Sequence, residues 1–233
     1  MATPVVQSQG AVAGGGTTGG NVSLSGVTSG ATLLLVLAQS PTSSGVTPVI
    51  TASSNASGAF TSDVAFFSAD SGSFNNGIAF LRLASAAAGA HTVTWSSTQS
   101  LDGISLFLLE LPSGYTFDSS ATNKALTTTT VTTSGYTPSR AALVFAAAQE
   151  AGLDAAAGLS HPPAGWTAQD QQQDGSTTAQ FAPLVISLKN ATTGAQSATW
   201  TWASSRTGYG VLAGYLPALA EGSTASLMGQ ACL

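Results

Sequence analysis

Two histidines are the only side chains whose ordinary chemistry would suit a general base near neutral pH. His91 begins a β-like segment, and His161 precedes two prolines in a polar stretch. Hydrolysis by a serine nucleophile needs a base held within reach of that serine, and the sequence has no Gly-x-Ser-x-Gly elbow to present one. We therefore expect both histidines to be solvated or turn residues, and we expect no enzyme activity.

Carboxylates are also scarce, with Asp and Glu together numbering 10. Asp170 and Asp174 lie four residues apart in a polar segment, where loop oxygens could bind a hard cation such as calcium. The further acids of a dedicated calcium loop are absent, so a solvated or docking loop is the favoured interpretation and no metal or other cofactor is predicted. Glu110 and Glu150 end apolar segments, which does not indicate the paired carboxylates of a glycosidase.

Aromatic residues offer a different chemistry, because an exposed ring can stack on a sugar. Trp95 and Trp200 stand at equivalent positions of a repeated segment, which predicts two core anchors. The residues that could instead form a glycan or partner contact are Trp166, Trp202, Tyr209 and Tyr215. For Trp202, which shares a face with Trp200, extension of the core is the favoured interpretation, and a sugar platform formed with Trp166, Tyr209 or Tyr215 is the alternative.

The charge balance is unusual, since only 6% of the residues are charged while 43% are hydrophobic. The formal net charge is −5 and Lys and Arg together number five, so no basic stripe exists to neutralise phosphates, and nucleic acid is not an expected partner. No apolar run is long enough to span a bilayer, and residues 1–6 lack the basic and apolar regions of an export signal. Cys232 has no second cysteine to pair with inside the chain, and an incidental free thiol is the favoured interpretation.

An internal repeat organises the chain. Residues 89–95 read GAHTVTW and residues 194–200 read GAQSATW, and the match continues without a gap to Leu111-Pro112 and Leu216-Pro217. Further matches follow in the same order, among them residues 22–28 with 131–137 and residues 58–61 with 164–167. Such ordered self-similarity indicates a duplicated structural unit.

The segments that must position these residues read as short strands. In residues 92–97, Val93 and Trp95 point to one face and threonine and serine to the other. Residues 14–20 are glycine-rich and are predicted to interrupt the first strand as a loop. Residues 33–37 and 106–109 are apolar on both faces, and the second face needs a covering loop, the sister half or another subunit. From this we expect a homo-oligomer or contacts with other proteins.

These features predict an all-β protein, a jelly-roll-like antiparallel β-sandwich built from two duplicated halves. The expected units are a first repeat at residues 1–112, a second repeat at residues 113–217, and an extended C-terminal arm at residues 218–233. The halves could form one sandwich or two, and the short aromatic link at residues 113–117 favours one body.

Several of these segments, read together, resemble the jelly-roll β-sandwich modules of tailed-phage minor tail, fibre and head-decoration proteins. The segments that carry the resemblance are residues 5–8, 30–36, 91–95, 109–111, 127–133, 141–148 and 164–167. The resemblance implies a non-enzymatic structural role on the virion surface after synthesis in the host cytoplasm. It implies contacts with other virion proteins, and it carries over no catalytic residue. A carbohydrate-binding or host-adhesion module, which would contact a host cell-surface glycan, is the alternative.

Overall fold

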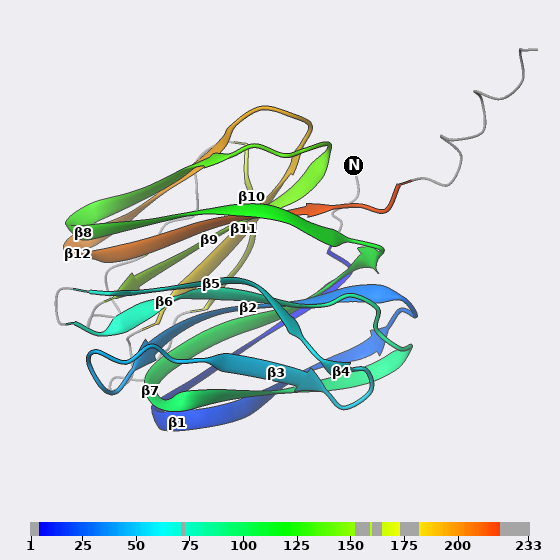
Figure 1. The fold of residues 1–233 in the computed structure, drawn as a ribbon, viewed down its shortest axis with the longest axis horizontal. Coiled ribbons are helices and arrows are strands. Elements are labelled where there is room, and N and C mark those ends of the chain that lie inside the picture. The colour runs from blue at the N-terminus through cyan, green and yellow to red at the C-terminus, as the bar shows by residue number, and fades with distance from the viewer. Residues whose placement is uncertain (1–4, 71–72, 152–158, 160–164, 173–181, 220–233) are drawn as a thin grey trace, which may run out of the picture.

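The computed structural model describes residues 5–70, 73–151, 159, 165–172 and 182–219. All regular structure within these residues is β-strand, and every pairing between strands is antiparallel. The strands form one 7-stranded and one 5-stranded sheet, which stack face to face (Figure 1). The prediction of an all-β antiparallel sandwich is confirmed.

The first sheet occupies the lower part of Figure 1 and has the order β4-β3-β7-β2-β6-β5, with β1 also paired to β7. Its strands are β1 (Gln7–Val27), β2 (Ala31–Pro41), β3 (Ile50–Ser54), β4 (Gly58–Ala59), β5 (Thr61–Ala69), β6 (Asn75–Leu83) and β7 (Gly89–Ser113). The second sheet has the order β10-β11-β9-β12-β8. Its strands are β8 (Thr116–Tyr136), β9 (Ala142–Ala151), β10 (Thr167–Gln172), β11 (Leu184–Ala191) and β12 (Gln196–Leu216).

The two sheets have the same connectivity. The path β1-β7-β2-β6-β5 in the first sheet corresponds, strand for strand in sequence order, to β8-β12-β9-β11-β10 in the second. The hairpin β3–β4 is present only in the first sheet as described. The first sheet ends at Ser113 and the second begins at Thr116, so each sheet is built from one repeat of the sequence.

The longest strands are β1, β7, β8 and β12. Each of them passes through a bend and then continues in a second layer, called the outer layer, on the far side of its own sheet. β1 bends at Gly15 and Gly16, whose φ angles are 71° and 86°, and β8 bends at Thr127, whose φ is 48°. Their partners β7 and β12 change register beside these bends. The predicted loop at residues 14–20 is therefore wrong: glycine permits the bend, but pairing with β7 resumes at Thr17 and Gly19 and the strand continues.

The bends create four layers with three apolar clusters between them. The central cluster joins the two sheets and includes Phe107 and Phe145. A second cluster lies between the first sheet and its own outer layer, where Val93 and Trp95 pack on Leu35 and Leu108. The third lies between the second sheet and its outer layer, around Trp200. Trp95 and Trp200 are 2% and 0% exposed, which confirms that both are core anchors.

This layering explains the strands that are apolar on both faces. In β2, Leu34 and Val36 face the central cluster, whereas Leu33, Leu35 and Leu37 face the cluster under the outer layer. All five side chains are fully buried within the single chain. The second apolar face of these strands therefore does not require another subunit.

The two halves differ in which face some of their aligned residues occupy, and the ungapped alignment of the sequence does not show this difference. Trp95 and its counterpart Trp200 both face outer clusters. Farther along the same strands, Leu108 faces the outer cluster while its aligned counterpart Ala213 faces the central one. Because successive side chains in a strand alternate between faces, a difference of one residue in the bend exchanges the faces of everything beyond it. Beyond the bend, the match without a gap therefore aligns residues that face different clusters.

Glycine residues in β12 make room for the large rings of the second outer layer. A Cβ added at Gly208 would meet the Trp202 ring, one at Gly210 would meet Thr133 and Trp200, and one at Gly214 would meet the Tyr136 hydroxyl. The first half has Leu106 and Leu108 in the corresponding strand, and it has only one tryptophan in its outer layer. In the second half, large rings of the outer layer pack on glycines of the sheet, whereas in the first half leucines of the sheet fill more of the space.

Polar contacts also tie the sheets together at one end of the sandwich. The Gln149 side-chain amide donates to the backbone carbonyl of Gln39 at 3.0 Å, and both residues are buried. The Tyr209 hydroxyl donates to the carbonyl of Ser68 at 2.9 Å. Lys124 Nζ donates to the Ser68 hydroxyl and to the Ala69 carbonyl, both at 2.9 Å.

Candidate interaction surfaces

His91 is not solvated, contrary to the expectation, because it is fully buried at the junction of β7 with the β3–β4 hairpin. Its Nδ1 lies 2.7 Å from the Ser54 hydroxyl, and its Nε2 lies 2.9 Å from the carbonyl oxygen of Ala87. Nε2 must carry a proton in order to donate to that carbonyl, and the Ser54 hydroxyl, which can donate or accept, pairs with Nδ1. Ser54 is itself only 4% exposed, so the pair holds the hairpin against β7 and does not present a nucleophile. His161 lies outside the described residues.

The two buried glutamates lie at opposite ends of the sandwich. Glu110 pairs with Leu33 near the start of β2 and accepts hydrogen bonds from the Gln7 side chain and the Thr28 backbone amide. Glu150 adjoins Gln149, which contacts the other end of β2, and its carboxylate lies 3.6 Å from Arg206 Nε. Neither the separation nor the surroundings fit a pair of glycosidase carboxylates.

Of the two weak metal candidates, one lies among the residues that the structure describes. Asp170 lies in β10, and Asp174 lies outside the described residues. The described residues contain no group of three or more His, Cys, Asp or Glu side chains arranged to hold a metal ion.

The four aromatic candidates do not form a surface platform. Trp202 is 5% exposed and donates from Nε1 to the Thr128 carbonyl, and Tyr209 and Tyr215 are completely buried. Burial raises the pKa of both tyrosines above its usual range, with a smaller contribution from nearby Asp70 and Asp63 respectively. Only Trp166 is partly exposed; it packs on the third cluster, with Lys189 Nζ 5.7 Å from its ring centroid. Three of these rings fill the core, as the favoured interpretation of core extension expected for Trp202, and they are too buried to form an exposed sugar platform with Trp166.

One carboxylate does organise a surface turn. Asp118 accepts hydrogen bonds from the Tyr136 hydroxyl at 3.0 Å and from the backbone amide and hydroxyl of Ser139 at 3.1 and 2.8 Å. Partial burial raises the pKa of this carboxyl, but the hydrogen bonds from Ser139 and Tyr136 and the charge of Arg140 outweigh it and lower the pKa below the ordinary value. This arrangement joins the start of β8 to the turn after it.

Among the described residues, the strands of the two outer layers carry no charged residue. Residues 19–27, 50–54, 58–59 and 89–97 make up the first outer layer, and residues 128–136 and 196–202 make up the second. None of these positions is Asp, Glu, Lys or Arg. The described charged residues lie in the two central layers and at the bends and turns, for example Asp63 with Arg82, which form an ion pair at 2.8 Å.

Hydroxyl groups cover both outer layers instead, and several of them bond across neighbouring strands. Ser23 and Thr92 are 3.1 Å apart, and Thr51 and Ser96 are 2.9 Å apart. In the second outer layer, the Thr132 and Thr199 hydroxyls are 2.8 Å apart. The alternation in the sequence predicted that residues 92, 94 and 96 face away from the core. It did not predict that such polar faces form the outer surfaces on both sides of the sandwich.

An exposed strand edge accompanies the first of these faces. β1 pairs with β7 along one side, and no backbone hydrogen bond to its other side occurs among the described residues. Its 21 residues include no charged residue and no proline. Natural proteins usually protect long edge strands with such residues. Sequence reasoning missed this edge because residues 14–20 were interpreted as a loop; the absence of charge between residues 5 and 62 was the signal that could have indicated it.

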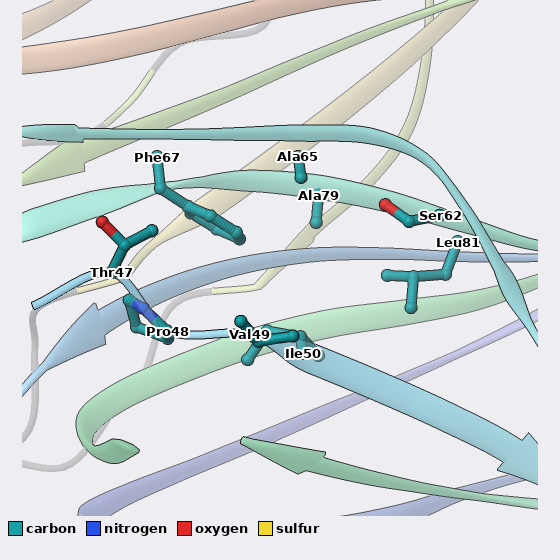
Figure 2. A pocket seen from close by; sticks show the side chains of 9 residues that line it. All are labelled: Thr47, Pro48, Val49, Ile50, Ser62, Ala65, Phe67, Ala79 and Leu81. Atoms are coloured by element: carbon teal, nitrogen blue, oxygen red, sulfur yellow. The ribbon is translucent and has the colours of Figure 1, made fainter. Parts of the chain in front are cut away.

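A small apolar pocket lies in the first half of the molecule, the half that contains β1 (Figure 2). It has a volume of about 260 Å³ and lies between the start of β3 with its preceding segment and the strands β5 and β6. Figure 2 shows Pro48, Val49 and Ile50 on one side and Phe67, Ala79 and Leu81 on the other. Its lining contains no charged side chain, so its chemistry suits an apolar group.

Comparison with known proteins does not assign the chain to a family. No protein-family model matches the sequence, and no curated protein matches it either. Within the described residues there is no helix of the length and apolar character needed to cross a membrane.

Proposed function

We propose that this protein is a non-enzymatic structural subunit of a phage virion, placed on the particle surface as a head-decoration or minor tail or fibre protein. Its role is to make contacts with other virion proteins. The duplicated sandwich and the resemblance of its segments to phage modules support this proposal.

The observation that carries the proposal is the pair of charge-free outer layers. Near-neutral, hydroxyl-covered surfaces generate little electrostatic repulsion between molecules and promote association. Flat β faces of this kind suit a fixed place in an assembly, where neighbouring subunits cover them. The apolar residues under these layers are already buried, so the contacts made there would be polar ones, with hydroxyl groups and bridging water.

The test is whether the protein is a stoichiometric component of particles. Tagged protein is produced in cells that assemble the virus encoding it, and the particles are purified by density gradient and washed with salt. We expect the protein to co-purify in a fixed ratio to the major capsid or tail protein. Its absence from washed particles would contradict the proposal.

A matched pair of variants tests the role of the outer layers in this assay. Thr132→Lys places a charge on the second outer layer, whereas Thr122→Lys places the same charge at an exposed position of β8 in a central layer. We expect Thr132→Lys to reduce incorporation into particles and Thr122→Lys to leave it unchanged. Equal incorporation of both would show that the outer layer makes no contact.

A carbohydrate-binding or host-adhesion module remains the alternative proposal, with a host cell-surface glycan as its partner. Of the four aromatic candidates, only Trp166 is partly exposed and could contact a glycan, so it is the residue that supports this alternative. Glycan-array binding that is abolished by Trp166→Ala would favour this alternative.

A further inference from the structure

We propose that two copies of this chain associate through the free edge of β1, in antiparallel pairing of residues 19–24 about a twofold axis. This inference rests on the proposed function, since it names the partner for one of the subunit contacts. The partner is a second copy of the same chain.

β1 stands out from the other edge strands of the molecule. β5 contains Asp63, β8 contains Asp118 and Lys124, β10 contains Asp170, and β4 is only two residues long. β1 is the one long edge strand of the described structure without a charged residue. Charges, short length and proline are the features that keep edges from pairing, and β1 has none of them.

Within β1, residues 19–24 form a regular stretch. These six residues pair one for one with residues 96–91 of β7, between a register change before Gly19 and another after Leu24. No side-chain hydrogen bond to the backbone of residues 20–24 occurs among the described contacts, so side chains do not cap the free backbone groups there. The unpaired amides and carbonyls of alternate residues can therefore form a new antiparallel ladder.

The side chains of this stretch complement their own twofold image. A register centred on Val22 sets Val22 against Val22 of the partner subunit, at the margin of the apolar cluster to which it already belongs. It sets Leu24 against Gly20 of the partner subunit. A glycine is needed at position 20 because a Cβ there would lie 3.0 Å from Trp95 Nε1. On the opposite face, Asn21 meets Ser23 of the partner subunit, and both are exposed, polar and uncharged. Identical strands thus keep apolar residues on one face and polar ones on the other.

The experiment compares the full chain with two variants by sedimentation equilibrium. Ser23→Lys puts a charge on the edge and brings two ammonium groups to neighbouring positions in the proposed dimer. Thr94→Lys is the matched control: Thr94 lies on the same exposed face, but between β1 and β3, so it is not on the edge. We expect a dimer for the unmodified chain and for Thr94→Lys, and at least about a tenfold higher dissociation constant for Ser23→Lys.

Three results would overturn the inference: an unmodified chain that is monomeric at all concentrations, a dimer that Ser23→Lys leaves intact, or equal weakening by both variants, which would place the contact on the face. Hydrogen exchange of the unmodified chain gives an independent readout, since the alternate amides of residues 20–24 that point away from β7 should gain protection as concentration rises. Particle incorporation separates the two proposals. If the protein is monomeric but is found in virions, the proposed dimer is refuted and the proposed virion role is not. If it forms the β1 dimer but is absent from virions, the virion role is refuted and the dimer is not.

Discussion

Small residues on one face of β12 set how closely the rings of the outer layer approach the sheet. Gly208, Gly210 and Gly214 lie under Trp202, Trp200 and Tyr136, and none of the three has a left-handed φ. Their role is therefore space and not backbone conformation. Tyr136 in turn depends on Asp118, which accepts a hydrogen bond from its hydroxyl and fixes the turn at Ser139.

Gly210→Ala tests this use of space. The added methyl group would overlap Thr133 and approach Trp200 within 2.9 Å, and overpacking of a filled core costs about 1–3 kcal/mol. Urea unfolding should show a loss of that size in the free energy of unfolding. Ser197→Ala, at an exposed position of the same strand, is the control and should change it by no more than about 0.5 kcal/mol. An unchanged midpoint for Gly210→Ala would mean that the rings can shift.

Asp118 predicts a pH dependence of stability. Its pKa is lowered in the folded state, so the unfolded chain binds the proton more tightly, and the stabilisation is present above the ordinary pKa of 3.8 and is lost as the pH falls through the folded value. Thermal unfolding should show that Asp118→Asn lowers Tm at neutral pH and has a vanishing effect in acid.

Asp102 provides a control of opposite sign for that measurement. Burial raises its pKa, so its ionisation opposes folding, and replacing it by Asn should have little effect in acid and should raise Tm once the pH exceeds 3.8. The same pH profile for both variants would contradict the assignment of Asp118.

At the scale of elements, β1, β7, β8 and β12 each run through a bend without interruption, so that each strand contributes to two layers. The bend in β1 uses two glycines, whereas the bend in β8 places Thr127, a β-branched residue, at a φ of 48°. Such a conformation is unfavourable for threonine and is held by the pairing of β8 with β12 on either side of the bend. Among the described residues of the second half, Thr127 is the one non-glycine residue with a left-handed φ.

Thr127→Gly should relieve that strain. The left-handed conformation costs an L-residue about 1–2 kcal/mol, and glycine loses about 0.5–1 kcal/mol more through chain entropy. We expect a net stabilisation of up to about 1.5 kcal/mol in chemical denaturation. Thr129→Gly, two residues along the same strand and equally exposed, should instead destabilise by about 0.5–1 kcal/mol. Destabilisation by both variants would refute the strain at residue 127.

For the whole molecule, the central cluster makes the two repeats one folding unit. Residues from both sheets interleave there, and Gln149, Tyr209 and Lys124 add hydrogen bonds between the halves. Because neither half can bury its inner face alone, we expect a single unfolding transition.

Phe145→Ala tests this coupling. Phe145 is fully buried in the central cluster, and its truncation should cost about 3–5 kcal/mol. Hydrogen exchange should show protection lost in strands of both halves, including β2 and β6, which belong to the other repeat. Loss confined to β8–β12 would mean that the halves unfold separately. Leu126→Ala, at a 53% exposed position, controls for loss of apolar volume without burial.

The sequence alone determined the features that depend on local periodicity and repetition. Alternation in residues 92–97 correctly placed Val93 and Trp95 in the core, and the order of the repeated segments correctly indicated a β protein with two equivalent halves. Within the predicted match of residues 58–61 with 164–167, Phe60 and Trp166 pack on equivalent outer clusters, and Thr61 and Thr167 begin equivalent strands.

Only the tertiary structure decided which layer covers each face. Periodicity shows that Leu33 and Leu34 point to opposite faces, but the bend that folds β1 and β7 back over β2 is what buries the second face. The same bends turn Tyr209 and Tyr215 inward, and the pairing of β3 with β7 brings Ser54 to His91. The number of residues in a bend fixes which face each later residue occupies, and that number has no periodic signature in the sequence.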